Sequence, residues 1–224
     1  MIRRALSALL VLLVLAGCGG SAGEDEGTAQ LWVTRDRGDE LLVEAEVEAG
    51  HTLMRALAAE AEVETRYGGR YIQSVNGVEG DLAAQRDWFW FVNGYEGDRS
   101  AASYRLHDGD VAWVDFRAWQ REGEARVVVG AFPEPFLHGY AGKRRSAVVR
   151  YEGDQGAQAA DIGKLVGADS VAPLGTPVPK GANVFELRLG ASRATAELLG
   201  ETAGDPVRFV ASGELDLARK YEVP

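Results

Sequence analysis

The amino-acid sequence predicts an α+β protein built from two small folded units. Segments that alternate apolar and polar residues, the pattern of half-buried strands, recur along the chain, and only a few segments show helical spacing. The 224 residues suffice for one large or two small domains, and 46% hydrophobic residues is ordinary for a globular protein. We therefore expect a first unit over residues 30–122 and a second α+β unit over residues 123–224.

Residues 1–17 have the composition of a secretory signal sequence. Two arginines precede an apolar run over residues 5–15, which is too short to span a bilayer comfortably, and small residues follow it. The tetrapeptide Leu-Ala-Gly-Cys that ends at Cys18 resembles the lipobox of bacterial lipoproteins, and this resemblance implies an acylated cysteine at the start of the mature chain. The alternative for Cys18 is a buried free thiol. Residues 18–29 are then a lipidated cysteine and a Gly-rich, acidic tether.

The first unit is expected to begin with two strands and a helix. Residues 31–34 are a short strand, and residues 41–48 alternate between apolar side chains and glutamates from Val43 onward, which indicates a strand with one wet face. Thr52 is an N-cap residue for a helix that extends to about residue 61, with its apolar side chains on one stripe.

Strands and tight turns make up the rest of the first unit. Asn-Gly pairs at residues 76–77 and 93–94 predict tight turns, because Asn and Gly tolerate positive φ. Further strands are expected at four places: residues 63–67, 71–75, 88–92 and 111–116. One helix packed on one face of a mixed sheet is an economical way to bury this set.

The second unit has the same mixed character. Strands are expected at residues 126–129, 146–151, 184–189 and 206–211. Helices are expected at residues 155–166 and, more briefly, at 194–199, and residues 130–142 are expected to be a loop. This unit resembles no family that we can name.

A series of motifs in the first unit resembles one known family, the transcobalamin C-terminal-like domain. The motifs are Gly50-His51-Thr52-Leu53-Met54-x-Ala56-Leu57, Tyr71-Ile72-x-Ser74-Val75-Asn76-Gly77, Trp88-Phe89-Trp90-Phe91-Val92-Asn93-Gly94 and Leu106-His107-Asp108-Gly109-Asp110-Val111-Ala112-Trp113. The resemblance covers about residues 31–118. It implies a β-grasp fold and contact with a corrinoid.

The aromatic residues of the first unit form the candidate ligand-binding site. In a strand over residues 88–92 both faces are apolar, so either the two tryptophans or the two phenylalanines lack a cover within the unit. One set then forms a flat platform for a planar ligand or a partner, or packs against the second unit as interdomain core. The candidate ligand-binding residues are Trp88, Trp90, Asn93, Gly94, Tyr95 and Trp113.

Composition and spacing argue against several other functions. A net charge of −10 is unfavourable for binding nucleic acid, which needs a basic face. The three histidines, His51, His107 and His138, lack metal-ligand spacing, so no metal site is expected. There is no phosphate-binding loop, and a Gly-x-Ser-x-Gly match at residues 19–23 lies in the tether, so we expect neither catalysis nor a resident cofactor.

Together these features predict an exported lipoprotein, anchored to the lipid bilayer through Cys18 on the extracytoplasmic face of the cell membrane. Its first unit is expected to capture a corrinoid or another small ligand for a membrane transporter. The alternative is a cell-envelope adaptor, in which the aromatic face meets another protein or the second unit.

Overall fold

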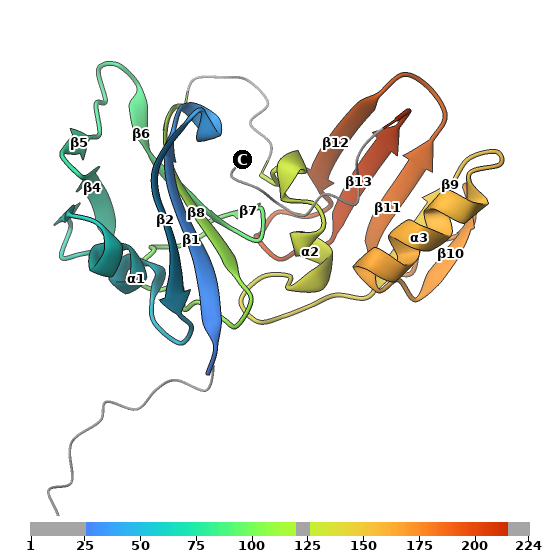
Figure 1. Cartoon of the computed structure of the whole chain (residues 1–224), viewed down its shortest axis with the longest axis horizontal. Helices are drawn as coiled ribbons and strands as arrows, with labels where there is room; N and C mark the ends of the chain where they lie inside the picture. Colours follow the sequence, from blue (N-terminus) through green and yellow to red (C-terminus); the bar gives the residue numbers. More distant parts are fainter. Residues whose placement is uncertain (1–25, 120–125, 215–224) are drawn as a thin grey trace, which may run out of the picture.

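The computed structural model describes residues 26–119 and 126–214, and it confirms the α+β class. Two five-stranded sheets lie on either side of the short helix α2 (Glu134–Leu137), and a small three-stranded sheet lies at the outer side of the first (Figure 1). The predicted signal sequence and Cys18 lie outside the described residues. Among the helices of the described ranges, none is long and apolar enough to cross a bilayer.

The first sheet is mixed, as predicted. Its strands are β1 (Thr28–Arg35), β2 (Glu40–Glu48), β6 (Arg86–Val92), β7 (Tyr95–Glu96) and β8 (Val111–Ala118). They lie in the order β2-β1-β8-β6-β7, with β1 and β8 parallel and the other neighbours antiparallel. Because β1 begins at Thr28, the last two residues of the expected tether belong to this sheet.

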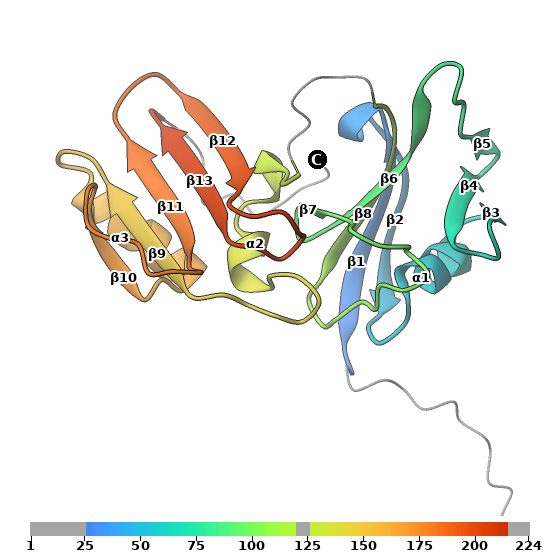
Figure 2. The same cartoon turned by 180° about the vertical axis from the view of Figure 1, so that it is seen from behind.

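Helix α1 (Leu53–Glu60) covers one face of the first sheet, and its start follows the predicted capping chemistry. The hydroxyl of Thr52 accepts the backbone N–H of Arg55 at 3.3 Å. Leu53 and Leu57 are fully buried and belong to the same core cluster as Leu31 of β1. Figure 2 shows α1 between this sheet and the small sheet.

The small sheet is a separate layer. It consists of β3 (Val63–Arg66), β4 (Tyr71–Val75) and β5 (Val78–Glu79), paired in that order. The Asn-Gly turn between β4 and β5 has positive φ at both residues, as expected. The indole N–H of Trp88 donates to the carbonyl of Val78 at 2.9 Å, which ties this layer to β6.

The second sheet is mainly parallel. Its strands are β9 (Ala147–Tyr151), β10 (Ser170–Pro173), β11 (Asn183–Arg188), β12 (Arg193–Leu198) and β13 (Val207–Ser212). The order is β10-β9-β11-β13-β12, with only the β12–β13 pair antiparallel. Helix α3 (Gly156–Val166) connects β9 to β10 and buries Ile162 and Val166.

Three local predictions for the second unit were wrong. The helix expected at residues 194–199 is the strand β12, because pairing with β13 and the alternation of half-buried Ala196 and Leu198 with exposed Glu197 outweigh helix propensity. The strand expected at residues 126–129 is a single bridge from Val127 to Tyr95, followed by a 3₁₀ turn, η2 (Val129–Ala131). The expected loop contains this turn and α2.

The segment between the two sheets is bonded to both of them. The N–H of Val128 donates to the carbonyl of Gly94 at 2.8 Å, on the side of the first sheet. On the other side, the amide of Asn183 in β11 donates to the carbonyl of Pro135 at 3.1 Å. Residues 126–142 therefore set the position of one sheet relative to the other.

Candidate functional site

The two faces of β6 carry different aromatic sets, as the alternation predicted. Trp88 and Val92 lie in the large core cluster with the α1 residue Leu57. Phe91 lies in a second cluster on the other face, together with Trp113 of β8 and Trp32 of β1. The sheet itself therefore separates Trp113 from Trp88 and Trp90, which the sequence analysis had placed in one site.

Trp88 and Trp90 are packed into the first unit. The Trp88 ring lies 5.2 Å from the ring of Phe116, between centroids, and is almost fully buried. Trp90 is half-buried, with its ring 5.4 Å from that of Tyr104, and lines a cavity of about 260 Å³ beside Arg99.

Asn93 and Gly94 form the β6–β7 turn at the junction of the two units, and Tyr95 begins β7. The Asn93 amide donates to Asp110 Oδ1 at 2.6 Å and to the carbonyl of Gly139 at 3.0 Å, and its oxygen accepts the N–H of Val111 at 2.8 Å.

The two residues that follow Asn93 are packed just as closely. A Cβ added to Gly94 would lie 2.3 Å from the Cβ of Ala131. Burial raises the pKa of Tyr95 far above its ordinary value. Asn93, Gly94 and Tyr95 thus join the units and line none of these four cavities.

An apolar cavity of about 470 Å³ lies between the two units on the Trp113 face of the first sheet. Phe91 and Trp113 line it from the first sheet, and the segment 127–130 lines it from the junction. The strand β12 supplies the far side with Ala194, Thr195 and Ala196. Three charged side chains complete the lining: Arg37, Glu96 and Arg117.

Arg117 is the polar centre of this cavity wall. Its guanidinium carbon lies 4.6 Å from the ring centroid of Phe91 and 4.5 Å from that of Trp113, a cation–π arrangement with both rings. Its Nε donates to Asp115 Oδ2 at 2.7 Å, and both residues of this ion pair are buried.

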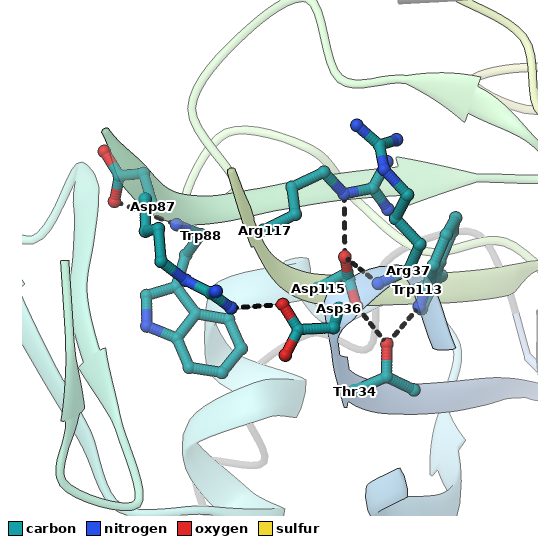
Figure 3. Close-up of polar contacts among 9 residues, drawn as sticks. Thr34, Asp36, Arg37, Asp87, Trp88, Trp113, Asp115 and Arg117 are labelled. Atoms are coloured by element: carbon teal, nitrogen blue, oxygen red, sulfur yellow. Dashed lines mark hydrogen bonds and ion pairs between the residues drawn. The ribbon is translucent and has the colours of Figure 1, made fainter. Parts of the chain in front are cut away.

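Asp115 is held in turn by other groups (Figure 3). Its Oδ1 accepts the hydroxyl of Thr34 at 2.5 Å, and that hydroxyl accepts the indole N–H of Trp113 at 2.7 Å. Its Oδ2 also accepts the backbone N–H of Arg37 at 3.1 Å. This network fixes the orientation of Trp113 and Arg117.

A polar recess of about 310 Å³ shares Arg37 and Arg117 with the apolar cavity. Asp36, Asp39 and Arg86 complete its charged lining, and Asp36 forms an ion pair with Arg86. The apolar cavity therefore has a charged end formed by two arginines.

The sequence analysis identified Trp113 as a candidate residue. It also gave the face of β6 that carries Phe91 as one of two alternatives. It missed Arg37, Arg117 and the β12 residues. The signal for Arg117 was present in the sequence. Trp113, Asp115 and Arg117 are spaced two residues apart along β8, so their side chains lie on the same face of the sheet. No local signal connects β12 with the aromatic face, since Phe91 and Trp113 are more than 80 positions from β12 in the chain.

The histidines are distributed over separate carboxylate pairs. His51 pairs with Glu48, His107 with Asp110 and His138 with Glu134, with N–O distances of 3.1, 3.5 and 2.6 Å. Within residues 26–119 and 126–214, no group of three or more His, Cys, Asp and Glu side chains could hold a metal ion.

Comparisons with known proteins find distant similarities. A family model described as "Domain of unknown function (DUF4430)" matches residues 50–118. No curated protein matches the chain.

Two solved structures are similar to part of the chain. A protein from Ruminococcus gnavus described as a "putative metal binding protein" is 18% identical with a TM-score of 0.35, and the match covers 42% of this chain and 99% of that one. Haptocorrin in complex with Cbi is 17% identical with a TM-score of 0.37, and the match covers 42% of this chain. The matched part is only 26% of the haptocorrin chain.

Proposed function

We propose that this protein is a non-catalytic binding protein that holds a small molecule with a flat apolar body in the cavity between its two units. The observation that carries the proposal is the cavity of about 470 Å³ lined by Phe91, Trp113 and the stacked Arg117. Its volume lies within the roughly 300–1,000 Å³ of small-molecule sites, and aromatic faces with a few fixed polar groups are their usual lining.

The position of the cavity supports capture by both units. Phe91 and Trp113 come from the first sheet, and Ala196 comes from the second. A ligand placed there would touch both sheets, so its binding would stabilise their relative arrangement as well as each unit. Because the hydrogen bonds around Asp115 already hold Trp113 and Arg117 in place, little ordering entropy is lost on binding.

The ligand class follows partly from the sequence resemblance. The motif series of the first unit implies corrinoid contact, and we propose a corrinoid as one ligand to be tested.

We further propose that the protein is exported, anchored through an acylated Cys18 on the extracytoplasmic face, and delivers its ligand to a membrane transporter.

The binding proposal predicts a ligand-dependent rise in thermal stability that a cavity-filling variant abolishes. A ligand at 100 times its dissociation constant adds about 2.7 kcal/mol, which corresponds to a Tm rise of about 5–10 °C for a protein of this size. The replacement Ala196→Trp puts an indole into the cavity and should remove the rise. The measurement is a thermal unfolding scan against a panel of planar aromatic acids, amines, cobalamin and cobinamide.

The matched control for this experiment is Ala84→Trp, which adds the same side chain at an exposed position outside the cavity. It should leave the ligand-induced rise unchanged. If no compound stabilises the wild-type protein, the binding proposal is wrong, and the aromatic face is better explained as a contact surface for another protein.

The anchoring proposal has its own test. Replacing Cys18 with serine removes the proposed acylation site and should move the protein from the membrane fraction to the soluble extracytoplasmic fraction. Mass spectrometry of the wild-type N-terminal peptide should show acyl chains on Cys18. Retention of the Cys18→Ser protein in the membrane fraction would contradict lipid anchoring at this residue.

A further inference from the structure

The edge of β6 that faces away from β8 is only partly paired. The N–H of Asn93 donates to the carbonyl of Val111 at 2.9 Å, in register with the β6–β8 ladder. Backbone groups in an antiparallel ladder alternate in direction, so the odd-numbered residues of β6 bond to β8. Trp88 and Trp90 therefore direct their backbone N–H and C=O groups away from β8.

Two of these four backbone groups already have partners. The N–H of Trp88 donates to Asp87 Oδ1 at 2.8 Å, and the carbonyl of Trp90 accepts the N–H of Gly97 at 2.9 Å. The other two, the carbonyl of Trp88 and the N–H of Trp90, have no hydrogen-bond partner within residues 26–119 and 126–214. One acceptor and one donor thus remain at this edge.

These two groups match one residue of an extended chain that runs parallel to β6. In a parallel ladder, a residue donates its N–H to the carbonyl before its counterpart, and its own carbonyl accepts the N–H after that counterpart. The free groups of Trp88 and Trp90 lie on either side of Phe89 and offer this pair. Antiparallel pairing needs both groups of one residue, and in each tryptophan one of them is already bonded.

The cavity of about 260 Å³ lies along this part of β6. Its lining includes residues 88–90 of β6, together with Tyr71 and Ile72 of β4 on the other side. Its volume is below the roughly 300–1,000 Å³ of most small-molecule sites, so it suits the end of a chain better than a large ligand.

Two exposed arginines, Arg70 and Arg99, also line this cavity. Arg99 forms two hydrogen bonds with Asp98, at 2.8 and 3.2 Å. The guanidinium of Arg70 has no hydrogen-bond or ion-pair partner in the part of the chain that the structure describes. The hydroxyl of Ser100 donates to the carbonyl of Arg70 at 2.5 Å, which holds Arg70 beside the segment 97–101.

The direction of the chain places its carboxyl end near these arginines. A chain parallel to β6 runs from Trp88 toward Trp90, and Gly97 bonds to Trp90 at that end. The acidic residue of the lining is Glu96, which pairs with Phe91 in the register of the sheet. Cross-strand partners share a face, so the Glu96 side chain lies on the face opposite to that of Trp90.

We propose that this edge of β6 binds the C-terminal residue of an extended peptide. The N–H of that residue donates to the carbonyl of Trp88, one oxygen of its carboxylate accepts the N–H of Trp90, and Arg70 binds the carboxylate. Pairing with a sheet edge and capture of a terminal carboxylate are both recurring modes of peptide recognition. The site is separate from the cavity of about 470 Å³ and does not depend on the function proposed for it.

The test uses dansyl-Gly-Ser-Gly-X peptides, with Ala, Val, Leu or Phe as X, each as the free acid and as the C-terminal amide. Fluorescence anisotropy measures their binding to the chain from residue 18 onward, with Cys18→Ser to prevent acylation. We expect at least one acid to bind and its amide to bind about tenfold more weakly, the effect of one charge-assisted hydrogen bond. An ester in place of the last peptide bond removes the N–H and should weaken binding about fivefold.

The variant that tests the carboxylate contact is Arg70→Gln. It should weaken binding of the acid about tenfold and leave binding of the amide unchanged. The matched control is Arg55→Gln, the same change of net charge at an exposed position on α1, and it should leave both affinities unchanged. Ala196→Trp, which fills the other cavity, should also leave them unchanged.

Each contrary result would overturn the proposal. Absence of binding by all four acids, or equal binding of acids and amides, would exclude a carboxylate site. Equal weakening by Arg70→Gln and Arg55→Gln would reduce the effect to net charge, and an ester that binds as tightly as the amide-linked acid would exclude pairing with Trp88. Loss of binding in Ala196→Trp would place the peptide in the other cavity.

Discussion

Replacing Asp115 with alanine is expected to lower the free energy of unfolding by about 3–5 kcal/mol, the cost of leaving a buried charge without its partner. Asp115 is fully buried, and Arg117, its ion-pair partner at 2.7 Å, is almost fully buried as well. The substitution also removes the acceptor for the hydroxyl of Thr34 and the backbone N–H of Arg37. Urea unfolding monitored by tryptophan fluorescence would measure the loss.

Two controls identify the cause of this loss. Glu197→Ala removes a carboxylate from the exposed ion pair with Arg208 on β12–β13, and it should cost no more than about 1 kcal/mol. The double variant Asp115→Ala/Arg117→Met removes both buried charges and should recover part of the stability. A loss below about 1 kcal/mol in Asp115→Ala would mean that the rings of Phe91 and Trp113, rather than the carboxylate, hold Arg117.

Replacing Asn93 with alanine is expected to cost about 3–5 kcal/mol, because it removes three buried hydrogen bonds and places alanine at a φ of 50°. One of these bonds, to the carbonyl of Gly139, crosses from the first sheet to the junction segment. The variant should therefore also loosen the contact between the two units, which limited proteolysis near residues 126–142 would detect.

The chain contains a matched control for this substitution. Asn76 begins the other Asn-Gly turn, with a φ of 48°, but it is exposed, and its side chain accepts one hydrogen bond, from the N–H of Glu62. Asn76→Ala should therefore cost only about 1–2 kcal/mol. Equal losses in the two variants would show that the cost lies in the backbone conformation and not in the buried bonds of Asn93.

Much of the fold was predictable because its signals are local. The glutamates of β2 alternate with apolar residues, Thr52 caps α1, and both Asn-Gly pairs adopt the positive φ that their residue types tolerate. The segment that forms β12 was mispredicted as a helix because Ala, Glu and Leu favour helices. Only its pairing with β13 makes it a strand.

The candidate site was predictable only in part. The apolar character of both faces of β6 indicated that one aromatic set would lack a cover within the first unit. In the structure Phe91 and Trp113 are almost fully buried, and Val128 and Ala131 of the junction segment pack with them. The sequence did not reveal that Trp88 and Trp90 would pack toward α1 while Trp113 lies on the opposite face with Phe91. That assignment depends on the register of β6 and β8, in which Trp113 pairs with Phe91.

By itself, then, the sequence determined the α+β class, most element positions, the turn chemistry and the aromatic character of both faces of β6, because each depends on residues close together in the chain. The tertiary structure decided which face of the first sheet carries the charged side chains of the cavity, and that β12 of the second sheet lies opposite this face. Arg37 and Asp115 are 78 positions apart, and the cavity joins Phe91 to Ala196. Contacts over such distances are set by sheet order and by the packing of the junction segment, which no local pattern encodes.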